Sequence, residues 1–389
     1  MNGKISEKIR YVGVNDLADQ LFENQWYIPT GISYNSYLVT GDKIALTDTA
    51  AADFNEQFIS NIKREIGDRR VDYLVINHME PDHSALISSV RKLYPDITIV
   101  TNARAVPMLK GFNNVCDNIQ VIKENDRLSL GGLTLEFHMI PMVHWPETMA
   151  TYCIEEKTVF SGDAFGSYGA VNDKITDDSE TFRLFRDDLI RYYSNIVGKY
   201  GKPVNSALEK LSCLDIKRIC PTHGPVWEKN IPEIVSLYQK MSKYETDRGV
   251  CLVYGSMYGN TEKAAMALAG ELEKLDIPCA VHDLCTENPS FALRDVFKYD
   301  ILAAGGPTYN NDIFPPVRNF IYSVCSRLVK NHKFVSFGSY SWGGGSVRLM
   351  NEMAAAHGME LISDGIQFSQ AYSKEKCDMK ALAGLIANC

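Results

Sequence analysis

The sequence predicts a two-domain protein of α/β and α+β class, in which mixed sheets covered by helices (residues 1–247) precede a doubly wound parallel sheet (residues 248–389). A chain of 389 residues exceeds what one hydrophobic core usually organises. The polar segment 243–249 precedes the apolar run 250–256, which indicates a domain boundary near residue 248. Strand-like and helical patterns alternate regularly only after that boundary.

The first 247 residues contain strand-like runs at 33–40, 43–50 and 133–140. Helical patterns at 54–66 and 182–198 lie among them. Mixed sheets covered by helices fit this combination, although periodicity alone leaves the strand order open.

The remaining residues alternate between strands and helices. Apolar strand-like runs begin at Val250, Ile277, Asp300, Lys333 and Leu361, and a helical pattern follows each of them. Five such units in about 140 residues predict a parallel sheet with helices on both faces.

Composition excludes several classes of partner. A formal net charge of -8 argues against nucleic acid and anionic membranes, because phosphate binding needs clustered Lys and Arg. The first 16 residues lack the apolar core of a signal peptide, and no stretch of about 18 apolar residues occurs in the sequence. We therefore expect a cytoplasmic protein with no membrane partner.

The ten cysteines are scattered and no two of them form CxxC. A zinc ribbon, a rubredoxin-type iron site and an iron–sulfur cluster are therefore disfavoured. We expect most of these cysteines to be buried thiols.

Potential metal ligands are concentrated in one loop. The apolar run 71–77 leads directly into His78, Glu80, Asp82 and His83. Further candidates follow later strand-like runs, namely His144, Asp163 and His223. Loops at strand ends converge, so these residues can share one site, and a multivalent cation would offset the cost of placing so many charged groups together. Three imidazoles and three carboxylates could form two coordination spheres with one shared carboxylate, as suits iron that activates small molecules.

The other four histidines stand outside this pattern. We expect ordinary core or surface positions for His138, His282, His332 and His357.

The ligand pattern resembles the metallo-β-lactamase superfamily over residues 27–224. That superfamily has a HxHxDH loop followed by His, Asp and His on later strands, and the resemblance implies an αββα sandwich. Glu80 stands where hydrolytic members carry a second histidine, and this replacement is the mark of flavodiiron proteins. A harder, anionic ligand favours iron over zinc.

The resemblance implies a distribution of the ligands between two non-haem iron ions per chain. One iron would be bound by His78, Glu80 and His144, the other by Asp82 and His223, and both by Asp163. It leaves open whether His83 ligates or lies beside the metal. The aromatic stretches 26–27, 34–37 and 192–193 resemble family segments near the iron site, or else belong to the core.

Three loops of the second domain predict a flavin site. The first strand leads into Ser256, Met257, Tyr258, Gly259, Asn260 and Thr261. Neither the lysine of a P-loop nor GxGxxG is present in this turn. Two later strand ends carry Pro307, Thr308, Tyr309, Asn310, and Ser339, Tyr340, Trp342, Gly343. Ligands bind at the carboxyl ends of such strands, and aromatic rings can stack on an isoalloxazine.

The three loops resemble those of flavodoxins, and the resemblance covers nearly all of residues 250–389. It implies a flavodoxin-like domain that binds FMN, with the hydroxyl-rich first turn at the phosphate.

The two sites together predict an oxidoreductase that passes electrons from FMN to a di-iron centre, which reduces dioxygen to water, nitric oxide to nitrous oxide, or both. Family resemblance implies a head-to-tail homodimer or a dimer of dimers. It also implies a separate electron donor, either a rubredoxin-like protein or reduced deazaflavin F420. Two alternatives remain open: a metal-dependent hydrolase fused to a flavodoxin, and a flavodoxin-type electron carrier with a non-catalytic metal domain.

Overall fold

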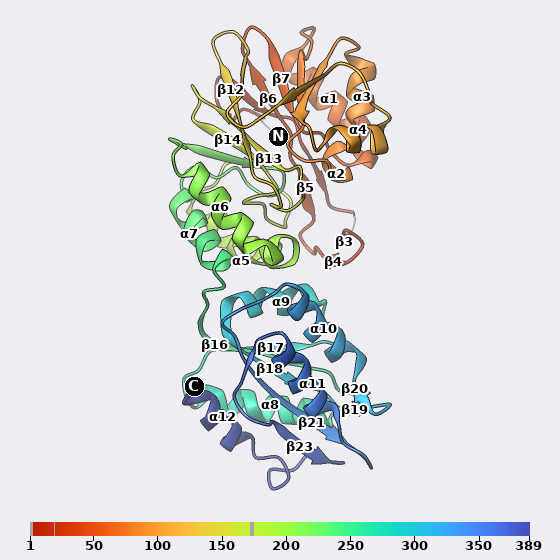
Figure 1. The fold of residues 1–389 in the computed structure, drawn as a ribbon, viewed down its shortest axis with the longest axis vertical. Coiled ribbons are helices and arrows are strands. Elements are labelled where there is room, and N and C mark those ends of the chain that lie inside the picture. The colour runs from red at the N-terminus through yellow and green to blue at the C-terminus, as the bar shows by residue number, and fades with distance from the viewer. Residues whose placement is uncertain (1–2, 19, 172–174) are drawn as a thin grey trace. The chain divides into compact units, whose positions relative to one another are not determined.

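The computed structural model describes residues 3–18, 20–171 and 175–389. The chain forms two compact units (Figure 1). The first comprises Met1–Tyr193 and Tyr200–Gln239, and the second comprises Ser194–Lys199 and Lys240–Cys389. The domain boundary at residue 248 stays a prediction.

The first unit contains two large sheets. The six-stranded sheet has the order β1 (Ile9–Tyr11), β6 (Tyr37–Thr40), β7 (Ile44–Thr47), β8 (Tyr73–Val75), β9 (Thr98–Asn102), β10 (Ile119–Ile122). The five-stranded sheet has the order β11 (Arg127–Ser129), β12 (Thr134–Met139), β13 (Met149–Cys153), β14 (Thr158–Gly162), β15 (Arg218–Pro221). Two small hairpin-like pairs add β2 (Val14–Asp16) with β5 (Ile32–Tyr34), and β3 (Leu21–Phe22) with β4 (Trp26–Tyr27).

Helices connect the parallel strands, as parallel neighbours require. Strands β7 to β10 run parallel, and so do β14 and β15. The helices of this unit are α1 (Asn55–Ile66), α2 (Pro81–Ser84), α3 (Ile87–Leu93), α4 (Val106–Asn113), α5 (Ser179–Tyr192), α6 (Gly201–Leu211) and α7 (Ile231–Ser242), the last of which runs into the second unit.

One apolar core fills the space between the two large sheets. It includes Val39 and Ala45 from the first sheet and Leu135, Phe137 and Phe160 from the second. The two inner faces therefore pack on each other, and the predicted αββα sandwich is confirmed.

The second unit is the predicted doubly wound parallel sheet. Its strands are ordered β17 (Cys279–Asp283), β16 (Asp247–Tyr254), β18 (Tyr299–Gly305), β21 (Lys333–Tyr340), β22 (Glu360–Leu361), and β23 (Ile366–Ser369) also pairs with β21. Its helices are α8 (Asn260–Glu273), α9 (Pro289–Lys298), α10 (Pro315–Ser326), α11 (Ser346–Ala356) and α12 (Met379–Ala387), and a small ribbon joins β19 (Thr308–Tyr309) to β20 (Asp312–Ile313).

Each central strand of this sheet contains a buried apolar run because helices cover both faces. Val250 and Leu252 of β16, Ala303 of β18 and Val335 of β21 are all fully buried. Among the residues described above, no helix is both long and apolar enough to cross a membrane.

Candidate metal centre and flavin site

All seven predicted ligands follow the carboxyl ends of strands in the first unit, five of them in loops and two, Asp82 and His83, in the short helix α2. The structure brings them together as two groups, in which the potential ligand atoms of each group lie within 4.8 Å of one another. The first group is His78, Glu80, His144 and Asp163, and the second is Asp82, His83 and His223.

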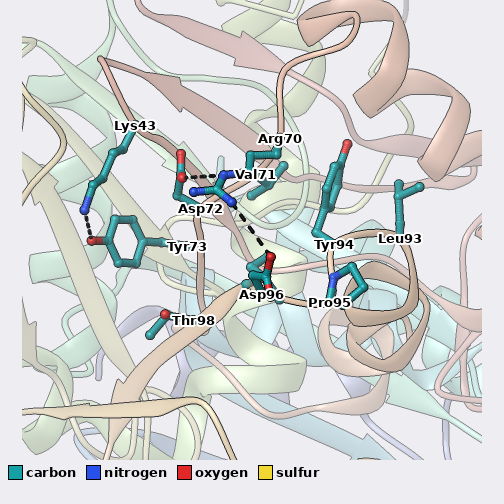
Figure 2. Close-up of a pocket in the computed structure, with 11 residues that line it drawn as sticks. Lys43, Arg70, Val71, Asp72, Tyr73, Leu93, Tyr94, Pro95, Asp96 and Thr98 are labelled. Atoms are coloured by element: carbon teal, nitrogen blue, oxygen red, sulfur yellow. Dashed lines mark hydrogen bonds and ion pairs between the residues drawn. The ribbon is translucent and has the colours of Figure 1, made fainter.

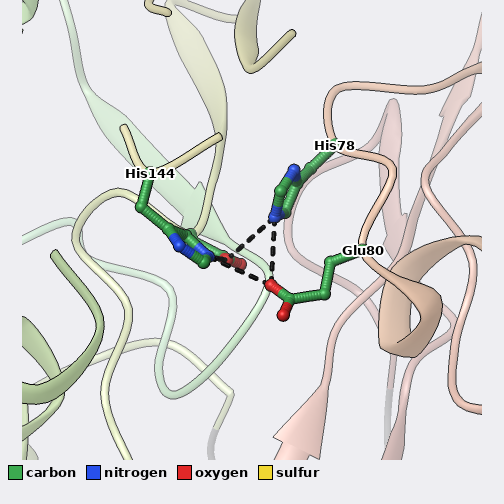
Figure 3. Close-up of side chains that lie close together, drawn as sticks. His78, Glu80 and His144 are labelled. Atoms are coloured by element: carbon green, nitrogen blue, oxygen red, sulfur yellow. Dashed lines mark hydrogen bonds and ion pairs between the residues drawn. The ribbon is translucent and has the colours of Figure 1, made fainter. Parts of the chain in front are cut away.

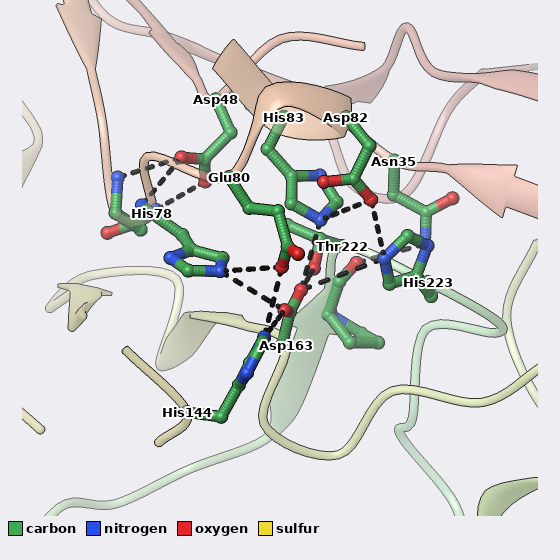
Figure 4. Close-up of polar contacts among 12 residues, drawn as sticks. Asn35, Asp48, His78, Glu80, Asp82, His83, His144, Asp163, Thr222 and His223 are labelled. Atoms are coloured by element: carbon green, nitrogen blue, oxygen red, sulfur yellow. Dashed lines mark hydrogen bonds and ion pairs between the residues drawn. The ribbon is translucent and has the colours of Figure 1, made fainter. Parts of the chain in front are cut away.

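The loop after β8 is shaped by a buried carboxylate. Oδ1 of Asp48 accepts hydrogen bonds from the backbone N–H groups of Asn77 (2.7 Å) and His78 (3.3 Å), and Oδ2 accepts one from the Asn77 side chain (Figure 4). Pro81 then begins α2, which is a favourable position because its missing N–H costs nothing in the first turn. The loop and the short helix thus hold the clustered ligands in place.

The first group converges on one point (Figure 3). Oε2 of Glu80 lies 3.2 Å from Nε2 of His78 and 3.0 Å from Nε2 of His144. Oδ2 of Asp163 lies 3.1 Å from the same nitrogen of His144 and 3.4 Å from that of His78. Two imidazole nitrogens and two carboxylate oxygens therefore face a common centre.

The second group is built in the same way around Oδ2 of Asp82. This oxygen lies 3.2 Å from Nε2 of His83 and 3.3 Å from Nε2 of His223. Oδ1 of Asp163 lies 3.0 Å from Nε2 of His83 and 3.7 Å from Nε2 of His223. Asp163 therefore directs one oxygen to each group, and the hydroxyl of Thr222 donates to its Oδ1 (2.6 Å).

The outer nitrogens of two histidines contact other protein groups. Nδ1 of His78 lies 2.8 Å from Oε1 of Glu147, and Nδ1 of His223 lies 2.7 Å from the backbone carbonyl oxygen of Ser33. Donation from Nδ1 leaves Nε2 of each ring free as a ligand, which is the usual arrangement of metal-binding histidines.

Electrostatics within the site are strongly perturbed. Burial opposes the charged forms, yet the imidazoles of His83 and His78 hold the pKa of Asp163 well below its ordinary value. Burial likewise opposes ionisation of Glu80, but hydrogen bonds from His144 and His78 lower its pKa to about 2. Burial would lower the pKa of His144, whereas Asp163 and Glu80 raise it to about 9. The carboxylates are therefore ionised, and the imidazoles beside them supply positive charge that a bound cation would replace.

The donor set fits metal ions. Both carboxylate oxygens of Asp82 and the Nε2 atoms of His83 and His223 are buried and, within the described part of the chain, form no hydrogen bond. Buried polar atoms without hydrogen-bond partners are costly, and a cation would satisfy them. Imidazole and carboxylate ligands suit iron.

Three aromatic rings lie near His223 of the second group. The rings of Phe22, Tyr34 and Tyr192 lie 5.2, 5.7 and 5.4 Å from the His223 ring. The Tyr192 hydroxyl is buried without a hydrogen-bond partner among the described residues. Burial first, and then the charges of Asp163 and Asp82, hold the pKa of Tyr192 well above its ordinary value.

Sequence reasoning did not single out Asp48, Glu147 or Thr222, which all support the site. Glu147 follows His144 by three residues, and Thr222 precedes His223, so proximity to predicted ligands was the available signal. Nothing in the pattern around Asp48 distinguishes it from other polar residues at a strand end.

The flavin loops meet at the carboxyl ends of β16, β18 and β21. They form a cavity of about 110 Å³. It is lined by Ser256, Met257, Tyr258, Asn260, Thr261, Pro307, Thr308, Ser339, Tyr340, Ser341 and Gln370. Sequence reasoning missed Ser341 and Gln370 as lining residues.

This cavity fits a phosphate group. The hydroxyls of Thr261 and Ser339 lie 3.1 Å apart, and Gly259 turns the chain with φ of 80° into α8. Helix α8 begins without a side-chain cap, so backbone N–H groups of its first turn remain for an anion.

The other predicted flavin contacts lie around the cavity or are exposed. Trp342 is 93% exposed and Tyr258 is 88% exposed, so their rings are available to stack on a ligand. Tyr309 packs against Phe314, with ring centroids 5.8 Å apart. Asn310 lies in the turn between β19 and β20 with φ of 51°, and Gly343 lies in the loop that leads to α11.

A separate cavity of about 320 Å³ lies at the opposite, amino-terminal ends of β7, β8 and β9 (Figure 2). Its walls include Tyr73, Tyr94 and the ion pair of Arg70 with Asp72 (3.2 Å). No residue predicted for either site lies there.

The fold and the site define a chain that joins a β-lactamase-like metal domain to a flavodoxin-like domain. Residues 32–224 match the family described as ODP family beta lactamase, and residues 252–382 match flavodoxin. A nitric oxide reductase of Moorella thermoacetica is 30% identical over 364 residues, which cover 92% of this chain and 91% of that protein. An anaerobic nitric oxide reductase flavorubredoxin of Vibrio vulnificus is 31% identical, and the match covers 92% of this chain and 73% of the relative.

Solved structures agree with these relatives. Rubredoxin oxygen:oxidoreductase from the anaerobe Desulfovibrio gigas superposes with a TM-score of 0.95 at 26% identity, covering 100% of this chain and 98% of that one. The flavodiiron protein from Giardia intestinalis shares the fold, with a TM-score of 0.93 at 24% identity and coverage of 100% and 97%. The chain belongs to the flavodiiron protein family.

Proposed function

We propose that this protein is an oxidoreductase that takes electrons through FMN and reduces dioxygen to water, nitric oxide to nitrous oxide, or both, at a centre of two iron ions per chain. The observation that carries the proposal is the pair of adjoining ligand groups that share Asp163. Glu80 supports iron over zinc, because an anionic oxygen ligand suits a metal that cycles between oxidation states.

The ligand residues divide between the two positions. His78, Glu80 and His144 would hold one iron, and Asp82, His83 and His223 the other. Asp163 would contact both. The distances from His83 to Asp82 and Asp163 support ligation by this histidine, which sequence left open.

When bound, the iron pair would supply open coordination positions and electrons for reduction of the gas. The protein's own groups orient and shield it. Phe22 and Tyr34 exclude water from the side of His223. The Tyr192 hydroxyl retains its proton, since its pKa is raised, and can donate a hydrogen bond to a gas molecule or a product oxygen.

In the second domain, the hydroxyls of Ser256, Thr261 and Ser339 and the first turn of α8 would bind the FMN phosphate. Tyr258 and Trp342 would stack on the flavin ring. The electron donor would be a separate rubredoxin-like protein or reduced deazaflavin F420. We further propose a cytoplasmic protein that works as a head-to-tail homodimer or a dimer of such dimers.

The test begins with counting iron, zinc and FMN in the purified protein. The protein is then reduced anaerobically and mixed with dioxygen or nitric oxide while flavin reoxidation and product are followed. We expect about two irons and one FMN per chain, with rapid reoxidation that yields water or nitrous oxide.

Two variants sharpen this experiment. Glu80→Ala should lose iron and gas reduction but retain FMN. The control Glu124→Ala removes a partly exposed carboxylate paired with Lys210 (2.6 Å) and should leave iron content unchanged. Zinc in place of iron would instead support a hydrolase fused to a flavodoxin, and slow reoxidation with release of peroxide would support a simple electron carrier.

A further inference from the structure

The two ligand groups are unequal in their outer contacts. Nδ1 of His78 faces a carboxylate, that of Glu147, whose side chain belongs to a residue only 2% exposed. Nδ1 of His223 faces the backbone carbonyl oxygen of Ser33, which carries only a partial negative charge. Nδ1 of His83 is buried and, among the described residues, has no hydrogen-bond partner.

Equal numbers of carboxylates face the Nε2 atoms of the two ligand groups. Glu80 belongs to the first group and Asp82 to the second, and Asp163 directs one oxygen to each. Each group therefore has one carboxylate of its own and a share of another. Glu147 adds a further buried carboxylate, and its ion-pair contact is with His78 of the first group.

We propose that Glu147 is a positioning residue that makes the two iron positions electronically unequal, and that it lowers the reduction potential of the position bounded by His78, Glu80 and His144. This inference rests on the di-iron function proposed above. It concerns the difference between the two positions rather than their existence.

The physical reason lies in the hydrogen bond to His78. An imidazole N–H that donates to a carboxylate becomes partly imidazolate in character, so its other nitrogen is a stronger electron donor. A stronger donor stabilises a ferric ion more than a ferrous ion. A backbone carbonyl polarises His223 much less, since it carries no net charge.

The surroundings of Glu147 hold its carboxylate against His78 and do not neutralise its charge. Its Oε1 also accepts a hydrogen bond from the Met79 N–H (2.9 Å), and its backbone carbonyl accepts one from the Asn102 side chain (2.6 Å). Its Oε2 is buried and has no hydrogen-bond partner within the described part of the chain. No cationic side chain is recorded within ion-pair distance of this carboxylate in that part, apart from His78 itself.

The test compares wild type with Glu147→Gln, a change that keeps the shape and removes the charge. The proteins, loaded with iron and FMN, are titrated anaerobically with dithionite, which supplies one electron to each ferric ion, and Mössbauer and EPR spectra follow the irons. In Glu147→Gln we expect the ferric-to-ferrous ratio of one iron to shift about tenfold toward ferrous at a fixed potential, or about 59 mV for one electron. The other iron should change little, so the two potentials converge and less half-reduced protein accumulates.

A matched control separates charge at His78 from loss of any buried carboxylate. Glu136 is 9% exposed and lies 3.2 Å from Nε2 of His138, outside both ligand groups. Glu136→Gln should leave both potentials unchanged. Glu147→Asp restores the charge and should return the potentials toward those of wild type.

Metal counts taken first distinguish failure of the proposed di-iron function from failure of the role proposed for Glu147. Wild type without iron would refute the proposed function. Two irons in Glu147→Gln with both potentials unchanged would overturn the role of Glu147 and leave that function intact. If Glu147→Gln does not retain iron, wild type and Glu147→Asp still test the proposal. Equal reduction potentials of the two irons in wild type would contradict it. A change in potential from wild type to Glu147→Asp as large as the difference between the two irons of wild type would also contradict it.

Discussion

A buried ion pair in the second domain allows a stability prediction that does not depend on any cofactor. His282 (5% exposed) lies between two carboxylates, with Nε2 2.9 Å from Asp295 and Nδ1 2.6 Å from Glu287. Asp295 is 1% exposed and also accepts from the Arg294 guanidinium at 2.8 and 3.0 Å. Asp295→Asn would therefore leave two cationic partners without this charge.

Breaking a buried pair by removing one partner typically costs 3–5 kcal/mol, and the lower end applies here because Glu287 remains beside His282. We expect a loss of about 3 kcal/mol in the free energy of unfolding of this domain, or roughly 6–12 °C in its Tm for a domain of about 150 residues. Urea unfolding of the protein without FMN, followed by circular dichroism, would measure it.

The loss should also depend on pH. Burial would lower the pKa of His282, but Asp295 and Glu287 raise it. The stability that the imidazolium contributes is therefore present below about pH 6.5 and is lost as pH rises through the raised pKa. Burial would raise the pKa of Asp295, but His282 and Arg294 lower it. The stability that the ionised carboxylate contributes is therefore present above about pH 4 and is lost as pH falls through the lowered pKa. The difference between wild type and Asp295→Asn should therefore be larger at pH 5.5 than at pH 9.

The exposed pair of Glu352 with Arg348 supplies the control. Glu352→Gln should change stability by less than about 1 kcal/mol, as is usual for surface ion pairs. A loss below 1 kcal/mol in Asp295→Asn, or a difference that grows from pH 5.5 to pH 9, would refute the assignment of a charged, buried pair.

Two further predictions concern the sites. Tyr192→Phe should retain iron and FMN but slow gas reduction about 10²-fold, because it removes a buried hydroxyl from a ring that lies 5.4 Å from that of His223. Single-turnover reoxidation measures this, and an unchanged rate would exclude the hydroxyl from the reaction. Ser339→Ala removes a hydroxyl 3.1 Å from that of Thr261 and should weaken FMN binding up to about tenfold, whereas the control Ser323→Ala on α10 should not weaken it. Fluorescence titration of the apoprotein with FMN measures both affinities. Equal affinity in the two variants would contradict the assignment of Ser339 to the phosphate site.

The second domain was predictable from periodicity. The buried part of a strand such as β16, from Val250 to Tyr254, is a continuous apolar run, and the alternation of such runs with helices determines the class of sheet. The first domain was not predictable in this way, because β1, β6 and β7 pair antiparallel before the sheet continues parallel, and spacing along the chain does not encode that change. Its αββα architecture came from the ligand pattern rather than from strand periodicity.

Some residues of the two sites could be predicted from the sequence and others could not. Residues predicted as ligands are chemically conspicuous, since histidines and carboxylates at strand ends are costly without a cation. Glu147 and Thr222 are conspicuous only in three dimensions, where one contacts His78 and the other Asp163. Trp342 was predicted by type and position, yet its 93% exposure depends on the loop conformation, which local sequence does not determine.

The metal centre takes its residues from two sheets and the flavin cavity from one, and this difference determines how each site depends on folding. His78 follows β8 of the first sheet, whereas Asp163 and His223 follow β14 and β15 of the second, so the metal centre forms only when the two sheets have packed together. The flavin cavity is built from the ends of β16, β18 and β21 within a single sheet. Metal binding is therefore linked to the stability of the whole sandwich, and ligand substitutions that abolish it leave every residue of the flavin cavity in place. FMN retention in Glu80→Ala follows from this separation, and loss of FMN together with iron would mean that the two sites are coupled.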